Sequence, residues 1–161
     1  MAKQGRAPPP AAGGVVASAE GPPMADRVRK VGYCTLEVPS RPGQAASVLA
    51  ALRRAGVDLL AFSGFPLGGG RAQLDLVAES LGGVRRVARR EGWRLGRPKR
   101  GFLIQGDDRV GAVHQHLQRL ADAKVNVTAV DAVTAGKRRY GVILWVKPRD
   151  VARAARALRA R

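Results

Sequence analysis

The sequence predicts an α+β protein built from two similar modules, because it repeats itself at a fixed offset of 68 residues that carries Gly43 onto Gly111. No gap is needed to align the two copies. The apolar positions that coincide include Leu49 with Leu117, Leu52 with Leu120, Val57 with Val125, and Leu76 with Leu144. A period of this length exceeds that of solenoid repeats and suits a small α/β unit. We therefore expect two modules of one fold, one after the other in the chain.

The first half of copy one predicts a strand followed by a helix. Val31–Val38 is a short apolar run that ends at Pro39, so it predicts the first strand. Gly43 then opens a helix pattern, and Gly56 ends it. The apolar stripe of this helix comprises Val48, Leu49, Leu52 and Ala55.

The second half of copy one predicts two strands, a helix and a short last strand. Asp58–Pro66 and Arg71–Glu79 are strand-like runs, and a glycine-rich turn separates them. A helix follows around Val84, because an apolar stripe there faces away from a row of arginines. Gly92 ends this helix before the last strand, Trp93–Arg97.

Copy two predicts the same elements except the last. They are strand Arg100–Gly106, helix Val110–Lys124, strands Asn126–Thr134 and Arg139–Lys147, and helix Asp150–Arg159. The final strand is missing, because Arg161 aligns with Trp93, where the last strand of copy one begins. The order βαββαβ, with two helices on one face of an antiparallel sheet, is the ferredoxin-like arrangement. The predicted fold is therefore two tandem ferredoxin-like βαββαβ modules, the second without its last strand.

The predicted domain boundaries place a disordered extension rich in Ala, Pro and Gly at 1–27, and the two modules at 28–98 and 99–161. A secretory signal is the alternative for the extension, but prolines and glycines interrupt the apolar stretch that a signal needs. Met24 is an alternative start. Cys34 is the only cysteine, so no internal disulfide can form. No apolar run is long enough for a membrane helix. We expect a cytoplasmic protein without a membrane partner.

The net charge of +17, from 29 Lys and Arg against 12 acidic residues, is typical of proteins that bind nucleic acids. The segment Arg138–Trp145 also resembles part of the RNP1 motif of RNA-recognition modules. Strand alternation argues against this function, because Tyr140 and Val142 are predicted to face the core, where no base can stack on them. The alternative is that the arginines occupy solvated helix faces. We expect any nucleic-acid binding to be weak and independent of sequence.

No group of residues predicts catalysis, a metal site or a cofactor. His114 and His116 are two residues apart on one helix, so their side chains point in different directions and cannot share a metal. At least one of them is expected to be a packing residue, and Cys34 is expected to fill the core. Asp107 and Asp108 lie on a loop without a third partner for acid–base chemistry. We therefore expect a protein that is not an enzyme.

The loops from the first strand to the first helix, 39–44 and 107–112, are the most informative segments. A glycine in each lets the backbone turn into a helix, whose free N–H groups and positive dipole end can hold a carboxylate. The alternative is that Gly43 and Gly111 serve only the turn.

These loops also carry a resemblance to a known family. The segments Val38–Gly43, Val48–Leu52 and Ala55–Leu59 resemble an ACT domain, the small regulatory module of amino-acid metabolism, and Arg109–Val127 resembles a second one. The resemblance implies a ferredoxin-like fold and ligand binding rather than catalysis, with amino acids as the usual ligands. It also implies that the ligand lies where two modules meet, between the loop of one and the second strand of the other.

By position, the resemblance assigns ligand contacts to both copies. In copy one they are Ser40, Arg41, Gly43 and Gln44, and in copy two Asp108, Arg109, Gly111 and Ala112; the second strands add Asp58 and Asn126. Serine-binding members of the family have an amide where this chain has Ser40 and Asp108. Asp58 is expected to repel a ligand carboxylate and to suit its ammonium group.

The resemblance implies an amino-acid-binding regulator or sensor that changes its association with a partner such as a regulated enzyme. The alternatives are a structural module with degenerate sites and a basic RNA- or DNA-binding protein.

The missing last strand predicts a homodimer. Strand Arg100–Gly106 is expected to have an unpaired edge, which a second chain would cover in a two-fold dimer with a continuous sheet. Leu103, Ile143 and Trp145 are expected to form an apolar patch on the open face of this module. The alternatives are that Val28–Tyr33 folds across this edge, or that Trp93–Arg97 serves both copies.

Overall fold

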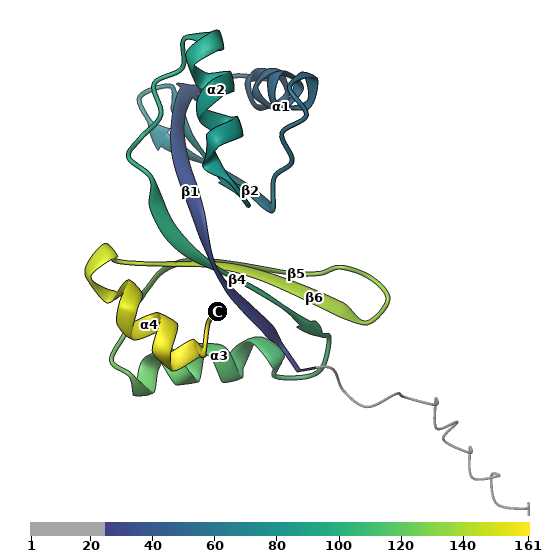
Figure 1. Cartoon of the computed structure of the whole chain (residues 1–161), viewed down its shortest axis with the longest axis vertical. Helices are drawn as coiled ribbons and strands as arrows, with labels where there is room; N and C mark the ends of the chain where they lie inside the picture. The colour runs from purple at the N-terminus through teal and green to yellow at the C-terminus, as the bar shows by residue number, and fades with distance from the viewer. Residues whose placement is uncertain (1–24) are drawn as a thin grey trace, which may run out of the picture.

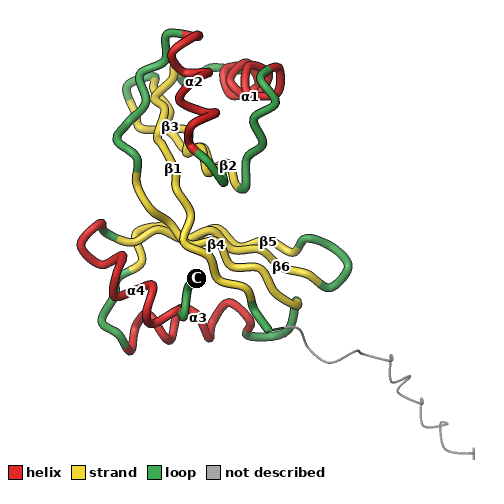
Figure 2. Tube along the Cα trace, in the orientation of Figure 1, coloured by secondary structure: helices red, strands yellow, loops and turns green. Residues whose placement is uncertain are grey.

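The computed structural model describes residues 25–161, which form one six-stranded antiparallel sheet with two pairs of helices (Figures 1 and 2). The strands are β1 Arg27–Pro39, β2 Ala61–Gly68, β3 Arg71–Ala78, β4 Lys99–Asp107, β5 Val127–Thr134 and β6 Arg139–Val146. The helices are α1 Gln44–Arg54, α2 Leu81–Glu91, α3 Ala112–Asp122 and α4 Val151–Leu158, with a short 3-10 turn at Pro148–Asp150. The predicted disorder of the extension falls mostly on residues 1–24, which lie outside the described residues.

The strand order β2-β3-β1-β4-β6-β5 confirms the predicted ferredoxin-like modules and joins them into one sheet. Strands β1, β2 and β3 with α1 and α2 form the first module, and β4, β5 and β6 with α3 and α4 form the second. Gly43 and Gly111 precede α1 and α3 in the left-handed region, with φ of 83° and 79°, where glycine is favoured. These two glycines therefore make the predicted turns into the helices.

β1 belongs to both modules. Its residues Gly32–Pro39 pair with β3, and Arg27–Tyr33 pair with β4 in the position where the second module lacks its own last strand. The alternative that Val28–Tyr33 folds across is therefore confirmed, and the prediction that strand Arg100–Gly106 has an unpaired edge is wrong. On its other side, the start of β1 bonds to Arg161, whose N–H donates to the Val28 carbonyl at 3.1 Å.

The segment Trp93–Arg97 contributes less than the predicted strand. It forms one antiparallel bridge, between Leu36 and Leu95, on the edge of β1 that β4 occupies further along. It therefore completes the first module only, and it does not serve both copies.

Each module has a core between its sheet and its helices. The first contains Leu36, Leu52, Leu76 and Val84, and the second contains Phe102, Ile104, Leu120 and Leu144, among others. Tyr140 and Val142 lie in the second core, as strand alternation predicts, so no base can stack on them. Cys34 is a buried free thiol, in agreement with its predicted packing role.

A third apolar cluster joins the two modules. Leu103, Ile143 and Trp145 form the predicted patch, but Tyr33 and Val77, with Val31, bury it within the same chain. The rings of Tyr33 and Trp145 meet edge to face, with centroids 6.0 Å apart. The patch therefore needs no second chain, and the predicted dimer loses both of the features on which it rested.

The sheet curls until its two edge strands meet. Ser63 of β2 donates a hydrogen bond to Asp131 of β5 at 2.9 Å, and these residues are equivalent in the two copies. Nearby, Asp75 is buried and accepts a hydrogen bond from Gln73 at 2.8 Å. Burial raises the pKa of Asp75, and the Asp131 carboxylate adds to this increase. No helix of residues 25–161 is long and apolar enough to cross a membrane.

The cluster that joins the modules predicts a specific loss of stability. Leu103→Ala should lower the free energy of unfolding by about 2 to 5 kcal/mol, because the side chain is 7% exposed and leaves a cavity. Leu49→Ala is the matched control, since this leucine is 38% exposed and its loss should cost about 0.5 kcal/mol or less. Urea unfolding measures both, and equal losses would contradict the packing.

Candidate functional site

The loop after β1 is fixed at both ends. The Ser40 N–H donates to the Gly70 carbonyl at 2.7 Å, which ties the loop to the turn between β2 and β3. At the other end, Gly43 leads into α1 without a side-chain cap. The first N–H groups of α1 therefore point toward this loop without a side-chain acceptor.

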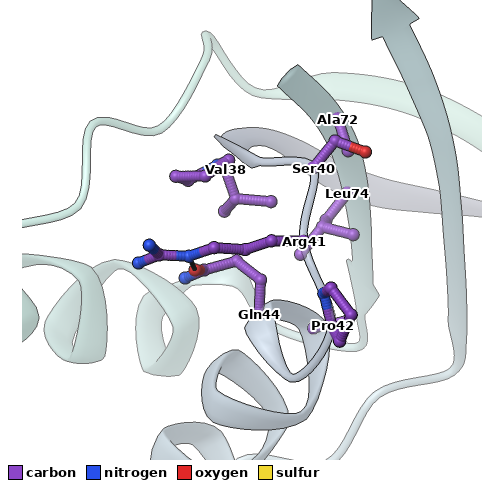
Figure 3. A pocket seen from close by; sticks show the side chains of 9 residues that line it. Val38, Ser40, Arg41, Pro42, Gln44, Ala72 and Leu74 are labelled. Carbon is purple, nitrogen blue, oxygen red and sulfur yellow. Dashed lines mark hydrogen bonds between the residues drawn. The ribbon is translucent and has the colours of Figure 1, made fainter. Parts of the chain in front are cut away.

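A pocket of about 290 Å³ opens beside this loop (Figure 3). Its apolar wall comes from Val38 of β1 and Leu74 of β3. The side chains of Arg41 and Gln44 extend together across it, and Arg41 Nε donates to Gln44 Oε1 at 3.3 Å. The Ser40 hydroxyl points away from them. The pocket thus combines an apolar wall with a guanidinium, an amide and a helix N-terminus.

A second hollow of about 600 Å³ adjoins this pocket and shares Val38, Pro39 and Gln44 with it. Glu37 and Arg71 form an ion pair at its edge. Beyond Leu36, no described strand pairs with this edge of β1. A carboxylate and free strand groups therefore line a hollow that adjoins the pocket of Arg41.

The equivalent loop of the second module has a different chemistry. Its pocket of about 240 Å³ is lined by Asp108, Gly111 and Ala112, together with residues of β5 and β6. Val110, which replaces Pro42, is fully exposed. Arg109 lies 3.5 Å from the Asp26 carboxylate. In the second loop an aspartate, Asp108, therefore takes the place of Ser40, and the arginine lies close to a carboxylate of its own chain.

Asp58 and Asn126 line neither loop pocket. Both are exposed, and each precedes the strand that it was predicted to open, because β2 begins at Ala61 and β5 at Val127. β2 and β1 both run antiparallel to β3, so β2 starts at the end of the module opposite the loop. The structure thus brings the loop residues of each copy together but separates them from Asp58 and Asn126.

A buried polar cluster lies in the second module. His116 is 1% exposed, and its Nε2 lies 3.0 Å from Asp26 Oδ2 and 3.0 Å from the Tyr140 hydroxyl. Gln115 donates to the same Asp26 oxygen at 2.7 Å. Gly106 makes room for this carboxylate, since a Cβ there would collide with it.

Sequence reasoning missed this cluster because Asp26 was assigned to the disordered extension. The signals that could have found it are the polar residue His116 on the apolar stripe of a helix and the tyrosine predicted to face the same core.

Burial sets the protonation of this cluster. It lowers the pKa of His116, although the hydrogen bond and the charge of Asp26 act in the opposite direction. A carboxylate can only accept, so a neutral His116 donates from Nε2 to Asp26. Burial also raises the pKa of Tyr140 to about 12, so its hydroxyl stays protonated. Within residues 25–161, no group of three His, Cys, Asp or Glu side chains could hold a metal ion.

Comparison with known proteins shows the fold. No protein-family model matches this sequence, and no curated protein does. A solved structure from Bacteroides thetaiotaomicron superposes with a TM-score of 0.68 at 13% identity, covering 83% of this chain and 88% of that one. The regulatory subunit of aspartate kinase from Thermus thermophilus superposes with a TM-score of 0.56 at 18% identity, covering 86% and 95%.

The aspartate kinase of Clostridium acetobutylicum, described as an allosteric enzyme, gives 0.53 at 16% identity, and the match covers 86% of this chain and 34% of the kinase. The fold is that of aspartate kinase regulatory subunits. The predicted ACT-type architecture is therefore confirmed, and the chain matches these subunits over nearly their whole length.

The buried histidine predicts a pH dependence of stability. Because the folded chain holds the pKa of His116 below 6.5, the unfolded chain takes up a proton first as the pH falls through 6.5. Stability should therefore decrease on acidification from about pH 8 to 5. His116→Gln should flatten this slope in thermal unfolding. His114→Gln should leave it unchanged, since this exposed residue is the only other histidine, and a slope that survives in His116→Gln would refute the assignment.

Proposed function

We propose that this protein is a non-catalytic regulatory protein that binds a free amino acid in the pocket between β1 and the start of α1. The observation that carries the proposal is the placement of Arg41 and Gln44 together over an apolar wall, beside an uncapped helix N-terminus. The fold shared with aspartate kinase regulatory subunits supports the regulatory part of the proposal.

Each chemical group of a free amino acid has a complementary part of the pocket. The α-carboxylate binds to the Arg41 guanidinium and the first N–H groups of α1. The ammonium group lies toward the unpaired edge of β1 in the adjoining hollow. The side chain packs on Val38 and Leu74, which favours a ligand with an apolar or short side chain.

The first module holds this site and the second does not. Asp108 takes the place of Ser40 and adds a negative charge to the lining of the second pocket, which disfavours a ligand carboxylate there. Arg109 takes the place of Arg41, and it lies 3.5 Å from the Asp26 carboxylate. We therefore expect one amino acid per chain. Gly43 and Gly111 serve the turn in both modules, and only the first turn leads to a site.

Regulation follows from the position of the loop. Ser40 is bonded to Gly70 of the turn between β2 and β3, so a ligand on Arg41 and Gln44 orders both segments at one end of the molecule. This surface is where a partner, such as a regulated enzyme, would sense the ligand. A structural module with a degenerate site is the alternative, and it predicts no binding.

Binding is tested by thermal shift and calorimetry against the free proteinogenic amino acids. A ligand at 100 times its Kd should add about 2.7 kcal/mol to the free energy of unfolding. Arg41→Gln should weaken binding about 10- to 100-fold, because a hydrogen bond to a charged group is lost. Arg53→Gln is the control, since it removes the same charge from the far end of α1. No binding by any amino acid would leave only the structural alternative.

A further inference from the structure

A cavity of about 920 Å³ lies in the second module, between the start of β1, α3 and the last residues of the chain. In Figure 1 the C-terminus lies next to β1 and above α3. Its lining contains six arginines, which are Arg27, Arg29, Arg109, Arg119, Arg159 and Arg161. Asp26 is the only acidic side chain among its described lining residues. The cavity therefore carries a strong excess of positive charge.

Little of this charge is neutralised within the described part of the chain. Arg29 pairs with Glu79 at 2.8 Å, and Arg109 lies 3.5 Å from Asp26. The other four guanidinium groups form no ion pair with a residue of 25–161. Residues 1–24 contain one acidic residue, Glu20, against Lys3 and Arg6. By composition, the chain cannot supply the missing negative charge from that segment.

Two buried polar atoms in this lining have no hydrogen-bond partner among the described residues. They are Nδ1 of His116 and Nε of Arg29. Leaving a buried polar atom unpaired costs free energy, so most such atoms in folded proteins find a partner. Both atoms belong to residues that line the same cavity. Nε of Arg29 is a donor, which an anionic ligand oxygen could accept from, whereas Nδ1 of the neutral His116 is an acceptor and needs a donor such as water.

Packing does not explain the arginines, as the first module shows. Its residues Trp93 and Ala51 are equivalent by the repeat to Arg161 and Arg119. Both lie against the first core, and Ala51 belongs to its buried part. The second module thus replaces two apolar packing residues by arginines around one cavity.

We propose that this cavity binds a small molecule that carries at least two phosphate groups, such as an inorganic polyphosphate or a nucleoside triphosphate. Planar guanidinium groups bind phosphate oxygens in pairs, and several of them facing one space suit several adjacent phosphates. The volume lies within the range of small-molecule sites. A nucleic acid would instead favour arginines spread along an open stripe. The site is separate from the pocket at Arg41, so it goes beyond the proposed function.

Titration calorimetry of the full chain at about 150 mM salt tests this inference, with tripolyphosphate and ATP as probes. We expect one molecule bound per chain for at least one of them. Arg119→Gln combined with Arg159→Gln should weaken binding at least about 10-fold, because two guanidinium contacts are lost. Arg86→Gln combined with Arg89→Gln is the control, since it removes the same charge from the outer face of α2 and should change affinity less than about 2-fold.

The two histidines supply a second measurement. In an imidazole NMR spectrum, tripolyphosphate should shift the signals of His116 and leave those of His114 unchanged, because only His116 lines the cavity. Tighter binding of ATP would show that the nucleoside is also contacted, and equal binding would show recognition of the phosphates alone; both support the proposal.

Three results would overturn it: equal losses in the two double variants, orthophosphate binding as tightly as tripolyphosphate, or binding of duplex DNA that tripolyphosphate does not displace. Amino acid binding at Arg41 should be unchanged in Arg119→Gln with Arg159→Gln, so the two sites succeed or fail independently.

Discussion

The pairing of β1 with β4 is the interaction on which the rest of the structure depends. It joins two three-stranded units into one sheet, and it supplies the last strand that the second copy lacks. It also brings Tyr33 against Trp145, so the open faces of the two modules bury each other. Without this pairing, each module would expose both a strand edge and an apolar face, and an exposed edge favours association. A single chain thus covers the strand edge and the apolar face that a dimer would otherwise have to cover.

Much of the fold could be predicted because its signals are local. Glycines mark the helix ends, alternation marks the strands, and the offset between Gly43 and Gly111 shows that the same unit occurs twice. The extent of β1 could not be predicted in this way. Arg27, Arg29 and Lys30 look like solvated residues, and their strand is fixed by pairing with β4, more than 70 residues later in the chain. Such non-local pairing leaves little signal in the segment itself.

The loop part of the candidate site was predictable because its signal is also local, whereas contacts between distant segments were not. The loop residues Arg41 and Gln44 are close in sequence, so the helix start brings them together. Asn126, from the second strand of the other module, was expected to join them, and this depends on how modules pack. Here the modules meet at β1 and β4, and the first loop lies at the end of β1 that β4 does not reach. The contact between His116 and Asp26 could not be predicted, because the two residues are 90 positions apart and only the folded chain brings them together.

The two copies show how one backbone can carry different chemistry. Both make the same turn at their glycines and bury equivalent leucines, such as Leu52 and Leu120, because the core has the same shape in each. At one buried position the two cores differ: Val48 packs apolar atoms in the first module, and its equivalent His116 makes hydrogen bonds in the second. A buried polar network of this kind is costly unless its members are satisfied, and a satisfied network favours one arrangement of the core. The shared shape therefore accounts for the fold, and the divergence at equivalent positions gives each module a different local chemistry.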